Sequence, residues 1–97
     1  MNMTTKRSEK VSRVFSALGD PTRLEILQTL LGYPGICVSA LAEELDLSVS
    51  AVSQQCKLME LSGVLVRKRM GQKICYQIRL DDPMVRRVVK LIQGGEL

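Results

Sequence analysis

The spacing of apolar residues changes from a helical to a strand-like period just after Gly63, and that change limits the folds open to this chain. Before Gly63, apolar residues recur at intervals of three and four, as they do on amphipathic helices. Residues 64–66 and 74–78 instead favour two short strands, joined by a turn at 70–72. Apolar residues at helical spacing then return over residues 83–93. The pattern predicts a mainly α fold with one small β-hairpin, in the order α-α-α-α-β-β-α.

Short polar residues and prolines mark the starts of several helices. Asp20, Ser48 and Asp82 each stand where an N-cap residue belongs, and Pro21 and Pro83 follow two of them at the first helical position. We expect residues 1–8 to form a flexible arm, because they lack an apolar pattern. The expected helices cover residues 10–18, 21–32, 38–45, 49–61 and 83–93 of a single 1–97 domain.

Composition excludes several classes of protein. A chain of 97 residues fits one small domain. It contains no histidine, which removes the commonest general base and the imidazole metal ligands, so we expect no enzyme activity. No apolar run approaches the roughly 18 residues that span a bilayer. The polar N-terminus lacks a signal peptide, so we expect a cytoplasmic protein that does not bind membranes.

The net charge of +4 is concentrated in one third of the chain. Residues 48–80 contain six basic side chains and one acidic side chain, Glu60, whereas the flanking segments are close to neutral. Such a concentration of positive charge is typical of proteins that bind a polyanion.

Two short helices joined by a tight turn, followed by a basic hairpin, form a winged helix-turn-helix. We place the helix-turn-helix at 38–62 and the wing at 64–79. The second helix of a helix-turn-helix enters a major groove of double-stranded DNA, where short polar side chains can read base edges. The predicted base-reading residues are Ser50, Ser53 and Gln54. The predicted contacts to the DNA backbone are Ser48, Gln55, Lys57, Arg67, Lys68, Arg69, Gln72 and Lys73.

The chain resembles the ArsR/SmtB family of winged-helix repressors in the runs at 17–27, 48–55 and 71–76. The resemblance implies a transcriptional repressor, released by a metalloid, a soft metal or a thiol-reactive signal. It also implies a homodimer on a near-palindromic operator, paired through the helices at 10–18 and 83–93. The apolar residues that would form this interface are Val11, Val14, Phe15, Met84, Val85, Val88, Val89 and Ile92.

The metal sites of the family match this sequence poorly. The zinc site on the last helix needs histidines, whereas Asp82 and Met84 occupy its first two positions, so we expect no zinc there. The second family site uses a Cys-Val-Cys run, which here is Cys37-Val38-Ser39. One thiolate does not make a three-coordinate site for a soft metal or metalloid, unless the fold brings Cys56 or Cys75 near.

The three cysteines are odd in number and lack C-x-x-C spacing, so we expect reduced thiols and no disulfide. Cys56 falls on an apolar stripe and is expected in the core. Cys37 opens a helix, where its thiolate is favoured, and Cys75 is expected to be partly exposed or at the dimer interface. We hypothesise that thiol chemistry at Cys37, with or without Cys75, tunes DNA affinity. The alternatives are a repressor with structural cysteines and no such inducer, and a module that binds other proteins.

Overall fold

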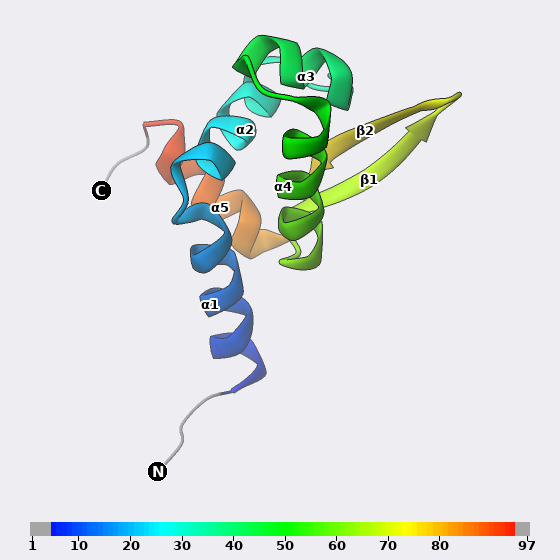
Figure 1. Ribbon diagram of the computed structural model, residues 1–97. Helices are drawn as coiled ribbons and strands as arrows, with labels where there is room; N and C mark the ends of the chain where they lie inside the picture. Colours follow the sequence, from blue (N-terminus) through cyan, green and yellow to red (C-terminus); the bar gives the residue numbers. More distant parts are fainter. Residues whose placement is uncertain (1–4, 95–97) are drawn as a thin grey trace.

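The computed structural model describes residues 5–94 and contains five helices and one two-stranded sheet in that range (Figure 1). Their order confirms the predicted winged helix-turn-helix. In chain order the elements are α1 (Lys6–Leu18), α2 (Pro21–Gly32), α3 (Val38–Leu45), α4 (Val49–Leu61), β1 (Leu65–Met70), β2 (Lys73–Ile78) and α5 (Pro83–Ile92).

Every described helix and the base of the hairpin contribute to one apolar core. Val14 of α1, Ile26 of α2, Val52 of α4 and Val64 before β1 are all fully buried within it. The outer part of the hairpin leaves this core and reaches beyond the helices (Figure 1). Within residues 5–94, no helix is both long and apolar enough to cross a membrane.

The predicted caps begin three of the helices. The side chains of Asp20, Ser48 and Asp82 accept hydrogen bonds from backbone N–H groups in the first turns of α2, α4 and α5, which otherwise lack partners. Thr5 caps α1 in the same way, so this helix begins at Lys6. The expected flexible arm over 1–8 is therefore wrong for residues 6–8, and residues 1–4 lie outside the described range.

The wing is an antiparallel hairpin whose register pairs Leu65 with Ile78 at its base and Met70 with Lys73 at its tip. Gly71 turns the chain there with φ of +65°, a conformation that side chains with a Cβ rarely adopt. Burial fades along β1 from Leu65 outward, since the strand leaves the core. The tip is therefore free to meet a partner.

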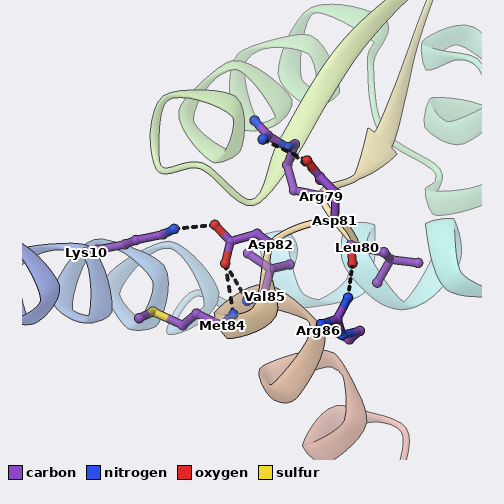
Figure 2. Close-up of polar contacts among 8 residues, drawn as sticks. All are labelled: Lys10, Arg79, Leu80, Asp81, Asp82, Met84, Val85 and Arg86. Carbon is purple, nitrogen blue, oxygen red and sulfur yellow. Dashed lines mark hydrogen bonds and ion pairs between the residues drawn. The ribbon is translucent and has the colours of Figure 1, made fainter.

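A polar cluster holds the start of α5 against α1 (Figure 2). Lys10 of α1 forms an ion pair with the carboxylate of Asp82, whose other oxygen accepts from the backbone N–H groups of Met84 and Val85. The hydrogen bond from Lys10 lowers the pKa of Asp82 below its ordinary value. Arg86 adds a hydrogen bond to the carbonyl of Leu80.

Candidate nucleic-acid interface

Helices α3 and α4 are joined by a turn that sets the angle between them. Asp46 ends α3 in the left-handed region with φ of 56°, and the backbone N–H of Leu47 donates to the Ala42 carbonyl at 2.9 Å. Ser48 then begins α4, its Oγ accepting from Ala51 N at 3.0 Å. This short, hydrogen-bonded connection is the turn of a helix-turn-helix.

One face of α4 is polar and open to solvent. Ser50, Gln54 and Lys57 are exposed, and Ser53 is half-buried between them. Together with Val49 these side chains line one shallow hollow on the helix surface. The opposite stripe of α4, including Val52 and Met59, is buried in the core. The predicted base-reading residues thus share one accessible face of α4.

The basic wing begins directly after this helix. The residues predicted to contact the DNA backbone there are all exposed: Arg67, Lys68, Arg69, Gln72 and Lys73. Figure 1 shows the hairpin beginning beside α4, with which β1 is in contact. The arrangement places a polar helix face and a cluster of positive charge on neighbouring elements, which suits a groove flanked by phosphates.

Gln55, another predicted backbone contact, is held from within the protein. Its side chain is half-buried, and its Oε1 accepts a hydrogen bond from Arg23 Nη1 at 3.0 Å. Arg23 belongs to α2 and was not predicted to have a site role. The one hint in the sequence that Arg23 has a role was its place in the run at 17–27, which carries the family resemblance.

Cys37 and Cys75 form a disulfide, which corrects the prediction of reduced thiols. The segment before α3 makes an isolated antiparallel bridge with β2, and this bridge brings the two Cα atoms to 4.0 Å. Cys37 is the N-cap residue of α3, and Cys75 lies within β2 opposite Lys68. Cys75 is also buried, rather than partly exposed as the strand alternation predicted.

Cys56, the third cysteine, is a core residue, as predicted. Its side chain is fully buried on the inner stripe of α4, and burial raises the pKa of its thiol to about 12. Desolvation disfavours the thiolate, so this thiol is inert at neutral pH.

A metal site of the kind known in the family does not fit this arrangement. Two of the three cysteine sulfurs are bonded to each other, and Cys56 lies apart from them as a free, buried thiol. Over residues 5–94, no three side chains among His, Cys, Asp and Glu come together as metal ligands. Asp82, the one match to the zinc site of the family, is bound instead by Lys10.

The predicted dimer residues divide into two groups. Val14, Val85, Val88 and Val89 are buried in the core of the chain itself, so little of their surface is open to a second chain. Val11, Phe15 and Met84 line an open groove between α1 and α5, where Phe15 is 56% exposed, whereas Ile92 is half-buried and is not part of its lining. The groove has a volume of about 610 Å³, and its apolar lining consists of Val11, Phe15, Pro83, Met84, Val88 and Leu91.

These features define a winged helix-turn-helix DNA-binding protein, and comparison with known proteins agrees. The family model described as winged helix-turn-helix DNA-binding matches residues 19–66. An uncharacterised HTH-type transcriptional regulator of Methanocaldococcus jannaschii is 31% identical over 87 residues, which are 90% of this chain and 96% of that protein.

Two solved structures are similar over most of their length. HlyU from Vibrio cholerae superposes with a TM-score of 0.82 at 26% identity, over 94% of this chain and 96% of HlyU. The homodimeric domain of Mb0332 from Mycobacterium bovis, a possible ArsR-family regulator, gives 0.76 at 26% identity, over 97% and 88%. The chain belongs to the ArsR/SmtB family of winged helix-turn-helix transcriptional regulators, a family of DNA-binding proteins and not of enzymes.

Proposed function

We propose that this chain is a repressor that binds a near-palindromic operator as a homodimer, with each α4 in a major groove. The observation that carries the proposal is the exposed polar face of α4, which includes Ser50 and Gln54, directly before a basic wing. Gln54 has the donor and acceptor pair that recognises adenine, and the serines hydrogen-bond to base edges. Lys57 and the wing supply contacts to phosphates, which position the protein without reading sequence.

The groove between α1 and α5 is the proposed dimer interface. Exposed Phe15 and Leu91, with Met84 beside them, give this face an apolar character that a second copy would cover. Pairing two chains places two α4 helices about one helical turn of DNA apart. A dimer bound over a promoter would block RNA polymerase, which is how repression follows from binding.

The proposed signal acts on Cys37 and Cys75. DNA lies in a compartment that keeps thiols reduced, so the dithiol is the resting, DNA-bound form. An oxidant such as a low-molecular-weight disulfide accepts two electrons and two protons from the pair, which leaves one S–S bond and two small thiols. That bond ties the middle of wing strand β2 to the start of α3. We expect the tie to restrict how the wing adjusts to the phosphates, and so to lower affinity.

The DNA-binding part is tested with reduced protein and two labelled duplexes, one from upstream of its own gene and one of unrelated sequence. Fluorescence anisotropy is measured between about 50 and 200 mM salt, where affinity that depends on several phosphate contacts falls steeply. The proposal predicts tighter binding to the upstream duplex and a steep salt slope on both. A chain that acts by binding other proteins would show neither preference nor slope.

The thiol part is tested with Cys37→Ser, which cannot form the disulfide. The variant should bind the upstream duplex as the reduced protein does and should lose the response to oxidant. If both its affinity and its response equal those of the unsubstituted protein, Cys37 is not the switch. The cysteines would then be structural.

A further inference from the structure

Arg23 joins three elements through one guanidinium group. Its Nε donates to the Ala17 carbonyl at 2.6 Å, and its Nη2 donates to the Ser16 carbonyl at 3.4 Å. Both carbonyls belong to the last turn of α1. Its Nη1 donates to Gln55 Oε1 at 3.0 Å, in the middle of α4. A residue of α2 therefore connects the end of α1 with the helix proposed to enter the DNA groove.

The α1 end of this connection has a clear physical basis. The last turn of a helix leaves carbonyl groups without partners within the helix and accumulates negative partial charge. No basic residue of α1 lies in that turn. Arg23 supplies the missing cation and the missing donors from the next helix. These contacts with α1 hold the guanidinium in place independently of Gln55.

The chemistry of the two groups fixes the orientation of the Gln55 amide. A guanidinium has donors only, so the amide must turn its oxygen toward Arg23. The amide nitrogen, with two donors, then faces away from Arg23. It makes no side-chain hydrogen bond to any other described residue. Phosphate oxygens are acceptors and suit such a group.

We propose that Arg23 is a positioning residue for DNA binding, because it orients the Gln55 amide as a phosphate donor and fixes α4 relative to the end of α1. The inference rests on the proposed function and goes beyond it by assigning a role to a residue outside the helix-turn-helix and the wing. Since α1 borders the proposed dimer groove, Arg23 also links the pairing of two chains to the placement of each α4.

Gln55→Glu separates positioning from donation. The glutamate retains an oxygen acceptor for Arg23, so the thermal unfolding midpoint should not fall. It lacks the amide donors and places a negative charge near phosphates. Affinity should therefore fall by about tenfold or more, and by the same factor on upstream and unrelated duplexes, since a phosphate contact carries no sequence information. Gln28→Glu is the matched control, because it adds the same charge at an exposed position of α2.

A double-mutant cycle then tests Arg23 itself. Arg23→Lys retains the positive charge but loses the planar fork that reaches α1 and α4 together. If Arg23 acts through Gln55, Arg23→Lys weakens DNA binding, and its effect shrinks when combined with Gln55→Ala. A residue that only stabilises the fold would lower the unfolding midpoint and leave the two effects on DNA affinity additive.

The outcomes separate this inference from the proposed function. Coupled losses of affinity on both duplexes, with Gln28→Glu unchanged, support it. Additive losses, or Gln55→Glu binding as tightly as the unsubstituted protein, overturn it while leaving DNA binding in place. If the unsubstituted protein binds neither duplex, the proposed function fails and this inference fails with it. Should Arg23→Lys not fold, the Gln55→Glu result decides alone.

Discussion

The disulfide between Cys37 and Cys75 joins the residue that caps α3 to a residue inside wing strand β2. The helix-turn-helix and the wing are the two elements proposed to touch DNA, and this bond connects them directly. It lies opposite Lys68, one of the exposed cations of the wing. A change in the bond is therefore a change inside the proposed DNA-binding surface.

The three cysteines should differ sharply in reactivity. Without reductant, iodoacetamide should label none of them in the folded protein, because two are bonded and Cys56 is buried with a pKa of about 12. After reduction, half-buried Cys37 should label in the folded protein, whereas buried Cys75 and Cys56 should label in full only on unfolding. Between pH 7 and 9 the rate at Cys56 should stay near zero, since both values lie far below its pKa. Mass spectrometry identifies the labelled sites, and early labelling of Cys56 would contradict this picture.

Gln54→Ala and Ser53→Ala should affect one class of DNA only. If either side chain reads a base, its loss costs about 1–3 kcal/mol on the upstream duplex and little on unrelated DNA. Anisotropy titrations with both duplexes give the two free energies. Equal losses on both would remove these residues from base reading.

Loss of a wing cation should lower affinity for every DNA sequence, unlike the loss of a base-reading residue of α4. Arg69→Ala or Lys73→Ala should weaken binding to every sequence and reduce the salt slope by about one for each phosphate that the variant no longer neutralises. Lys90→Ala, an exposed cation on α5, is the matched control. A wing variant with an unchanged slope would place that cation away from phosphate.

The ion pair between Lys10 and Asp82 should make stability depend on pH. Because the folded pKa of Asp82 lies below its unfolded value, the pair stabilises the fold above the unfolded pKa of about 4, and the contribution is lost as pH falls through the folded pKa. Asp82→Asn keeps an N-cap side chain but removes the charge. Urea unfolding should show the variant less stable at pH 7 and nearly equal at strongly acid pH. A pH-independent difference would mean that the ion pair is not its source.

The order of elements was predictable because its signals are local. The caps at Asp20, Ser48 and Asp82 begin helices as their side-chain chemistry requires, and Gly71 turns the hairpin. The placement of Cys56 followed from helical spacing alone. The α4 face was predictable for the same reason, since burial of Val52 and Met59 leaves Ser50 and Gln54 outward.

The features that sequence analysis missed depend on long-range packing. The disulfide forms because the segment before α3 bridges a strand 38 residues further on, which no local pattern encodes. Val14 and Val85 lie on apolar stripes, but a stripe does not tell whether it faces its own core or a second chain. The link from Arg23 to Gln55 likewise spans two helices that are separated in sequence.

The most direct test compares the reduced and the oxidised protein on the upstream duplex, by fluorescence anisotropy at one fixed salt concentration, with Cys37→Ser measured in parallel. We predict that the reduced protein binds at least about tenfold more tightly, or roughly 1.4 kcal/mol, and that Cys37→Ser binds as the reduced form under both conditions. Equal affinity of the two redox forms would contradict a regulatory role for the Cys37–Cys75 pair.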